Sequence, residues 1–223
     1  MRANLGISSD APIFVAGSVR TGEDKIVLKA FCNIRKKFPK FRLLIAPSYY
    51  SNTIKLNDVF SEAGLDYQRK TALDAGEHPR DVVLIIDTFG ELARLYGLGT
   101  VNFVGASIIP KGKLAFGHNP IEPLMHGRPL LFGPYMNHWG EITDVLLEAY
   151  KGLQVCTDEE MTRTILHILQ DPGVMKRVCQ AAEQVITSNS GAVETNLAFA
   201  VEKITEAGIV AQPGKSVAGS FSP

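Results

Sequence analysis

The sequence has few cysteines and no excess of charge of either sign. Cys32, Cys156 and Cys179 are the three cysteines among 223 residues, too few and too scattered for a disulfide framework or a zinc site. Lysines and arginines number 23, and so do aspartates and glutamates, so no net field attracts nucleic acid from a distance. We therefore expect a reducing compartment, no bound metal and no nucleic-acid partner.

Long apolar runs and the commonest catalytic motifs are also absent from the sequence. No stretch reaches the roughly 18 apolar residues of a membrane-spanning helix, and the N-terminus MRANLGISSDAPIF lacks the apolar core of a signal peptide. GxGxxG, GxxxxGK[ST] and GxSxG do not occur. These absences argue against export, a spanning helix, a P-loop and a serine hydrolase.

The sequence does have an ordinary globular composition, with 45% hydrophobic and 21% charged residues. Short apolar runs alternate with amphipathic stretches, which predicts an α/β fold with a Rossmann-like, doubly wound parallel sheet. The expected strands are Ile13 to Ala16, Arg42 to Ala46, Tyr67 to Arg69, Val82 to Ile86, Val101 to Val104 and Leu130 to Phe132, with a short one at Gln154 and Val155.

Helical spacing and capping residues predict the helices and the domain limits. One helix is expected from Glu23 to Lys37, and C-terminal helices from Thr157, from Pro172 and over residues 192–207. Residues 1–12 are expected to lead into a single domain over residues 13–208. The Gly-, Ser- and Pro-rich tail, 209–223, is predicted to be disordered.

Ligands of open parallel sheets bind beyond the carboxyl ends of the strands, so the loops after the strands are the candidate sites. After the first strand, Gly17, Ser18 and Arg20 precede a helix, which suits close approach to a phosphate or carboxylate. A tight turn without a ligand explains the same residues.

The loop after the fourth strand reads DTFGE. Asp87 or Thr88 is expected to cap the following helix, and Glu91 lies in its first turn, where negative charge is stabilised. Capping alone and a role in lining the cleft both remain open for this segment.

The segment GHNPIEP, which follows the fifth strand, has the features of an anion site at a helix start. Pro120 suits the first helical position, so Asn119 becomes the expected N-cap, with Gly117 and His118 before it. Glu122 lies in the first turn, where it can accept hydrogen bonds from two ribose hydroxyls. A surface glutamate and a packed histidine are the alternatives.

Several motifs occur in an order that resembles a known family. FVAGSVRTGE, LIAP, DTFGEL, FVGAS, GHNPIEP, GRPLLFGP with Asn137 and SNSGA resemble the C-terminal, donor-binding domain of 3-deoxy-D-manno-octulosonic acid (Kdo) transferases, glycosyltransferases of GT-B fold. The resemblance covers residues 13 to 192. It implies donor-binding roles for Gly17, Ser18, Arg20, Gly117, His118, Asn119 and Glu122, and also for Asp87, Thr88 and Glu91.

The resemblance also implies an activity. The family transfers Kdo from CMP-Kdo to a lipid A precursor in lipopolysaccharide biosynthesis, at the cytoplasmic face of the inner membrane, with which it is associated. In this family Arg20 and a helix N-terminus would neutralise the leaving phosphate, so that no cofactor or metal is required. The catalytic base belongs to an N-terminal domain, for which we find no sequence here.

Two departures from the family pattern affect the site. Ser48 and Tyr49 stand where the family has a basic Arg-His pair, which removes an expected anion contact. Extra residues, Lys113 to Phe116, precede Gly117 and would displace it.

Other functions fit the same residues. A different GT-B enzyme, such as a UDP-sugar epimerase or transferase, shares a glycine-rich loop followed by a glutamate. A non-catalytic nucleotide-sugar-binding module is the remaining alternative.

Overall fold

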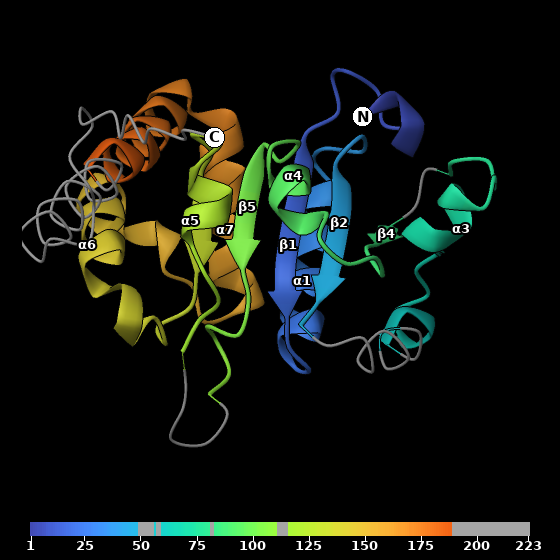
Figure 1. Ribbon diagram of the computed structural model, residues 1–223, viewed down its shortest axis with the longest axis horizontal. Coiled ribbons are helices and arrows are strands. Elements are labelled where there is room, and N and C mark those ends of the chain that lie inside the picture. Colours follow the sequence, from blue (N-terminus) through green and yellow to red (C-terminus); the bar gives the residue numbers. More distant parts are fainter. Residues whose placement is uncertain (49–55, 57–58, 81–82, 111–115, 189–223) are drawn as a thin grey trace, which may run out of the picture. The chain divides into compact units, whose positions relative to one another are not determined.

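The fold is a six-stranded parallel sheet with helices on both faces (Figure 1). The computed structural model describes residues 1–48, 56, 59–80, 83–110 and 116–188. The strand order is β3-β4-β2-β1-β5-β6. The strands are β1 (Ile13–Val19), β2 (Arg42–Pro47), β3 (Tyr67–Arg69), β4 (Val83–Ile85), β5 (Val101–Val104) and β6 (Leu130–Phe132).

Helical segments accompany the sheet, a helical turn at 59–62 among them, and so do three single 3₁₀ turns. The α-helices are α1 (Glu23–Arg35), α3 (Lys70–Asp74), α4 (Leu92–Tyr96), α5 (Ile121–Leu124), α6 (Gly140–Ala149) and α7 (Asp158–Gln170), followed by helical residues 172–188. The 3₁₀ turns are η1 (Ala3–Leu5), η2 (Asn137–Trp139) and η3 (Lys151–Leu153). Within these segments, no helix is both long enough and apolar enough to cross a membrane.

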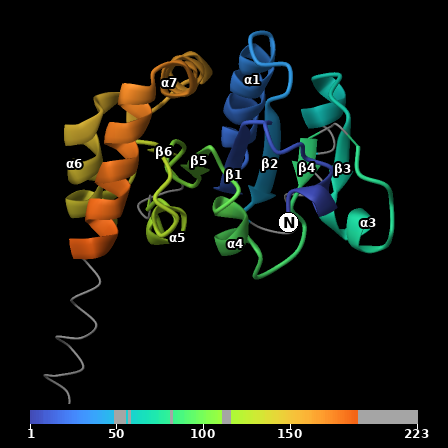
Figure 2. The ribbon, with the colours of Figure 1, turned by 90° about the horizontal axis from the view of Figure 1, so that it is seen from above.

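Alternate side chains of β1 enter two hydrophobic cores. Phe14 and Ala16 belong to the core that includes α1 and α7, whereas Ile13 and Val15 belong to the core that includes η1 and α4. Both faces of the strand are therefore buried, as the continuous apolar run of a parallel strand requires. Figure 2 shows α1 and α7 on one face of the sheet and α4 with the N-terminus on the other.

The helices begin where capping residues allow it. Thr157 accepts a hydrogen bond from the Glu160 N–H at 3.2 Å, and the Glu160 carboxylate accepts one from the Cys156 N–H at 2.7 Å. This reciprocal pair starts α7 at the cap that the sequence predicts. In α1, the expected apolar face is confirmed, with Val27, Phe31 and their neighbours buried, although the helix ends at Arg35 rather than Lys37.

The doubly wound parallel sheet is confirmed, with two differences in detail. β1 continues to Val19 through a register irregularity, so that Gly17 and Ser18 lie in the strand rather than in the loop after it. The short strand expected at Gln154 is a single bridge to Phe132. The helix expected over 192–207 and the tail 209–223 lie outside the described residues, and the limits at 12 and 208 stay predictions.

Candidate functional site

The carboxyl ends of β1, β2 and β5 meet at one edge of the sheet, at the lower end of the strands in Figure 1. β1 pairs with β2 on one side and with β5 on the other. The chain therefore reverses its direction of winding beside β1, and open α/β sheets bind their ligands at such a switch point. Arg20, Ser48 and Gly105, which follow these three strands, are the first residues beyond this edge.

Two glycines let the chain ends of β1 and β5 approach closely. The Gly105 N–H donates to the Gly17 carbonyl at 2.8 Å. A Cβ on Gly17 would lie 1.9 Å from the hydroxyl of Tyr96, and Ser18 has a left-handed φ of 56°. The structure thus gives Gly17 a packing role against α4 and β5, and the predicted approach of Gly17 and Ser18 to a phosphate or carboxylate stays a prediction.

Gly105→Ala is expected to lower the free energy of unfolding by about 1–3 kcal/mol, because the added methyl overpacks a rigid backbone contact. The new Cβ would lie 2.4 Å from the Ser18 carbonyl oxygen and 2.8 Å from the Val19 Cα. Urea denaturation measures the change. Gly140→Ala is the matched control, since a Cβ at Gly140 meets open space. Equal midpoints for the two variants would contradict the packing argument.

Arg20 carries the least satisfied polar group of this edge. Its backbone N–H donates to Glu23 at 2.9 Å. Its Nε and Nη1 are buried and have no hydrogen-bond partner among the described residues. Buried guanidinium N–H groups without an acceptor are unfavourable, and the oxygens of a phosphate or carboxylate are suitable acceptors for them. The side chain is therefore prepared for an anion.

His118 lies beside Arg20 and links β5 to β2. Its Nε2 is 2.8 Å from the Ser48 Oγ, and its N–H donates to the Gly105 carbonyl at 3.2 Å. Packing around the ring and the Arg20 guanidinium lower the pKa of His118, against the opposing charge of Glu23. The imidazole is accordingly held neutral, as a polar group that can exchange hydrogen bonds with a ligand.

The contact with His118 shows what Ser48 does at the position where the family has a basic residue. The serine hydroxyl occupies the end of β2 and bonds to the imidazole, so the position contributes a neutral hydrogen bond instead of a positive charge. Among the described residues, Arg20, from the loop after β1, supplies the positive charge that lowers the pKa of His118. Tyr49 lies outside the described residues.

The helix expected after GHNP is shorter than its sequence predicts. α5 is a single turn that begins at Ile121, with Pro120 at the cap position. Asn119 still caps it, because its Oδ1 accepts the Ile121 N–H at 2.9 Å. Pro120 and Pro123 have no N–H to offer, so this turn has few free amides and a small dipole. The expected anion site at this helix start therefore depends on side chains more than on the helix.

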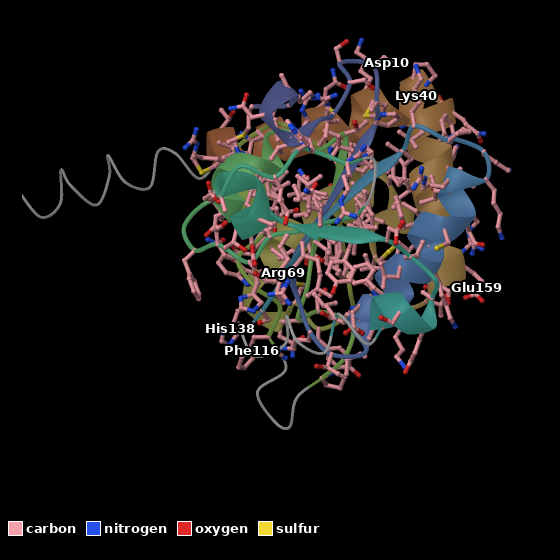
Figure 3. All side chains as sticks on the ribbon, turned by 90° about the vertical axis from the view of Figure 1, so that its right-hand side faces the viewer. Asp10, Lys40, Arg69, Phe116, His138 and Glu159 are labelled. Atoms are coloured by element: carbon pink, nitrogen blue, oxygen red, sulfur yellow. The ribbon has the colours of Figure 1, made fainter. Side chains whose placement is uncertain are left out.

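Gly117 is fixed in place despite the extra residues before it. Its N–H donates to the Tyr135 carbonyl at 2.7 Å, and a Cβ would lie 1.9 Å from the Met136 sulfur. Phe116 stacks on His138 with ring centroids 3.6 Å apart (Figure 3). Gly117 is thus a buried glycine held against the loop after β6. Residues 113–115 lie outside the described residues, and the displacement of Gly117 by the extra residues stays a prediction.

Glu122 lies in the turn α5, close to a tyrosine that sequence reasoning missed. Tyr96 of α4 is buried beneath Gly17. Burial, and then the negative charge of Glu122, raise the pKa of Tyr96. The Glu122 carboxylate is half-buried and makes no hydrogen bond within the described ranges. Both of its oxygens can therefore accept hydrogen bonds from the hydroxyl groups of a ligand.

Asp87 does not cap the helix that follows it in sequence. Its carboxylate accepts the Thr71 N–H at 3.0 Å and the Thr71 hydroxyl at 2.7 Å, so it binds the start of α3. α4 has Glu91 at its cap position, without a side-chain cap bond. The prediction that Asp87 caps the following helix, α4, is therefore wrong. The first turn of α3 lies beside the end of β4, and Asp87 binds Thr71 of that turn instead.

Thr88 and Glu91 form their own pair, in which the Thr88 hydroxyl donates to the Glu91 carboxylate. Lys70 Nζ lies 3.7 Å from Glu91. Next to this pair, a cavity of about 190 Å³ lies beyond the ends of β2 and β4. It is lined by Ala46, Pro47, Ser48, Ile86, Asp87, Thr88, Phe89, Gly90 and Leu92. Ser48 thus joins this cavity to His118, and the candidate site runs along the sheet edge.

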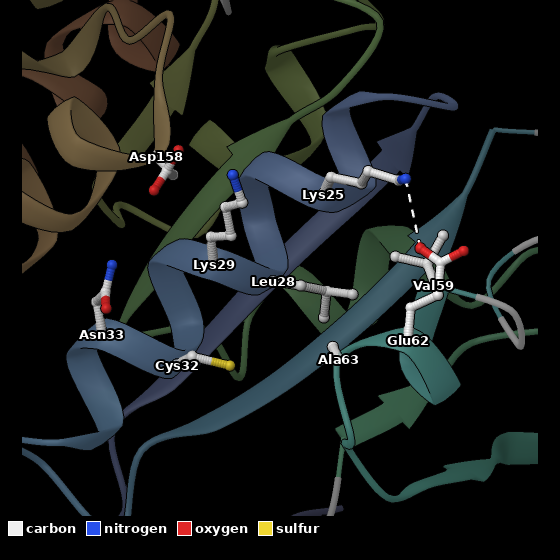
Figure 4. A pocket seen from close by; sticks show the side chains of 9 residues that line it. All are labelled: Lys25, Leu28, Lys29, Cys32, Asn33, Val59, Glu62, Ala63 and Asp158. Carbon is white, nitrogen blue, oxygen red and sulfur yellow. Dashed lines mark ion pairs between the residues drawn. The ribbon is translucent and has the colours of Figure 1, made fainter.

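A larger cavity, of about 630 Å³, lies away from this edge (Figure 4). Its walls are α1, the helical turn at 59–62 and the start of α7, and it contains the Lys25–Glu62 ion pair at 3.5 Å. The lining residues are Lys25, Leu28, Lys29, Cys32, Asn33, Val59, Glu62, Ala63 and Asp158. None of them is a predicted site residue, and none follows a strand end.

The domain is α/β and Rossmann-like, of the GT-B type. This class follows from the strand order of the sheet and from the switch point beside β1, where Arg20 offers hydrogen-bond donors to an anion. The C-terminal CMP-Kdo binding domain of WaaA from Acinetobacter baumannii has this fold, with a TM-score of 0.72 and 20% identity over 83% of this chain and 93% of that one. No protein-family model matches the chain.

Sequence comparison gives the more particular relationship. The chain is 30% identical over 186 residues to the 3-deoxy-D-manno-octulosonic acid transferase of Haemophilus influenzae, and 30% identical over 164 residues to that of Aquifex aeolicus. These alignments cover 83% and 74% of the chain, but 42% and 44% of the relatives. The chain is thus related to the Kdo transferases, which are glycosyltransferases, and the resemblance of its motifs is confirmed.

Proposed function

We propose that this chain is the donor-binding domain of a Kdo transferase and binds CMP-Kdo. The observation that carries the proposal is the Arg20 guanidinium, which lies at the switch point of a GT-B-type sheet and whose buried Nε and Nη1 have no partner in the part of the chain that the structure describes. The donor of the related enzymes contains a phosphodiester, whose oxygens are suitable acceptors. Sequence similarity to the curated Kdo transferases supports this donor over a UDP-sugar.

The candidate residues divide among the parts of the donor. Arg20, His118 and Ser48 would bind the phosphate, since they converge on one point beyond β1, β2 and β5. Glu122 would accept the ribose hydroxyls. Thr88 lines the neighbouring cavity and would contact a further polar part of the donor. Gly17, Ser18, Gly117 and Asn119 would shape the backbone around these groups. Asp87 lines the same cavity as Thr88, and Glu91 accepts the hydrogen bond of the Thr88 hydroxyl.

This arrangement stabilises a leaving group. In transfer, the bond between the anomeric carbon of Kdo and the phosphate oxygen breaks, and the phosphate of CMP takes the electron pair. Arg20 would donate to the developing charge, and hydrogen bonds from the His118 and Ser48 side of the site would add to this stabilisation. The donor chemistry needs no cofactor or metal from this chain. The acceptor hydroxyl attacks the opposite face of the sugar carbon.

The proposed acceptor is a lipid A precursor, and the proposed setting is lipopolysaccharide biosynthesis at the cytoplasmic face of the inner membrane. The chain spans less than half the length of the curated relatives that it matches. Transfer requires a second half across the cleft, whether on the same polypeptide or on another. That half would supply the base that deprotonates the acceptor.

Joining the chain to the remaining, N-terminal part of a Kdo transferase tests the activity. The joined protein is expected to transfer Kdo from CMP-Kdo to a lipid A precursor, and the same protein with Arg20→Ala is expected to transfer at least about tenfold more slowly. Mass spectrometry of the acceptor measures both rates. A folded joined protein that binds CMP but forms no product would argue for a non-catalytic module instead.

A further inference from the structure

Glu23, the first residue of α1, is a fully buried carboxylate that bridges two loops of the site. Its Oε2 accepts the Arg20 N–H at 2.9 Å and the Ala106 N–H at 2.7 Å. Its Oε1 accepts the Ser107 and Ile108 N–H groups, both at 2.8 Å. With the more distant Ile109 N–H at 3.5 Å, five backbone donors compensate for the loss of water around one buried charge.

Both bridged segments adjoin the candidate site. The first carries Arg20, and the second follows Gly105, whose carbonyl accepts the His118 N–H at 3.2 Å. The second segment is held in an unusual conformation, since Ala106 has a left-handed φ of 59°. A residue other than glycine adopts this conformation at a cost in free energy, and surrounding contacts must hold it there. The hydrogen bonds to Glu23 turn the successive amides of this segment towards a single point.

We infer that Glu23 is a positioning residue of the donor site, whose carboxylate sets the spacing between the Arg20 loop and the segment that carries His118. The inference rests on the proposed function, in which Arg20 and His118 bind one donor phosphate. Glu23 does not contact the donor in this account. It acts by keeping two donor-binding groups, from chain segments more than 80 residues apart, aimed at the same place.

Asp24 provides a matched control beside Glu23. It is also buried, and its Oδ1 accepts the N–H groups of Gly22 and Lys25, both at 2.8 Å. These bonds are local to the start of α1 and do not reach the segment at 106–108. Asp24→Asn therefore perturbs the same helix start and removes the same charge, without touching the bridge between the loops.

Glu23→Gln tests the inference, because the amide group places N–H donors against backbone N–H groups. CMP binding, measured by calorimetry, is expected to weaken by about tenfold or more, as two charge-assisted bonds are lost. Hydrogen exchange at Ala106, Ser107 and Ile108 is expected to accelerate. The pKa of His118, measured by NMR, is expected to fall, because the Glu23 charge that raises it is removed. Asp24→Asn should leave CMP affinity and these amides near the parent values.

A folded Glu23→Gln variant with parental CMP affinity and protected amides would overturn the inference. If that variant does not fold, Glu23→Asp replaces it, since its side chain is one methylene shorter and does not reach the second segment. An unchanged CMP affinity of Glu23→Asp would also contradict the inference. Failure of the parent chain to bind CMP would count against the proposed function alone. The exchange rates of Ala106 to Ile108 then still decide whether Glu23 holds the two segments together.

Discussion

Arg20→Ala is expected to weaken the binding of CMP by roughly 10- to 100-fold, the effect of losing hydrogen bonds to a charged group worth about 1.5–3 kcal/mol. The reason is that two N–H-bearing nitrogens of the guanidinium, Nε and Nη1, are buried and lack hydrogen-bond partners within the described residues before the ligand binds. The cost of removing these N–H groups from water is therefore already present in the free protein. A phosphate therefore gains hydrogen bonds without the protein having to surrender any.

Two further variants make this result specific. Arg20→Lys keeps the positive charge but loses the paired donors of the guanidinium, so its affinity should lie between those of the parent and Arg20→Ala. Arg163→Ala removes an exposed positive charge of α7, on a different part of the domain, and should leave CMP affinity unchanged. Equal losses of CMP affinity for Arg20→Ala and Arg163→Ala would show that Arg20 acts through the net charge of the protein and not through contact with the phosphate.

The fold was largely predictable because its signals are local. Most strands of the sheet contain a short apolar run, and the alternation of Phe14 with Val15 between two cores requires helices on both faces. α1 follows from the spacing of Val27, Phe31 and Ile34. The ends of expected elements moved, and the strand expected at Gln154 is a single bridge. β1 extends through Gly17 because contacts with β5 continue the ladder there, which no local pattern shows.

The candidate site was predictable only in part, because its decisive contacts join distant segments. Ser48 and His118 are 70 residues apart and form one hydrogen bond. Asp87 has the sequence of a cap for the next helix, yet it binds Thr71 of an earlier one. Glu23 looks like an ordinary acidic residue at a helix start, and its partners at 106–108 are visible only in the folded chain.

A second large effect is expected in the choice of nucleotide base. Cytosine presents an amino donor and a ring acceptor where uracil presents a carbonyl acceptor and a ring donor. A site that forms hydrogen bonds with one base leaves its own buried polar groups unpaired with the other, which is worth about 100-fold or more in selectivity. CMP and UMP share the ribose and the phosphate, so their comparison isolates the base from Arg20 and Glu122.

The measurement that tests the account most directly is calorimetric titration of this chain with CMP, UMP and UDP under one buffer and salt concentration. The account predicts saturable binding of one CMP per chain, binding of UMP that is weaker by about 100-fold, and CMP binding that is weaker by roughly 10- to 100-fold in Arg20→Ala. Preferential binding of UDP, or a CMP affinity that the loss of Arg20 leaves unchanged, would contradict it.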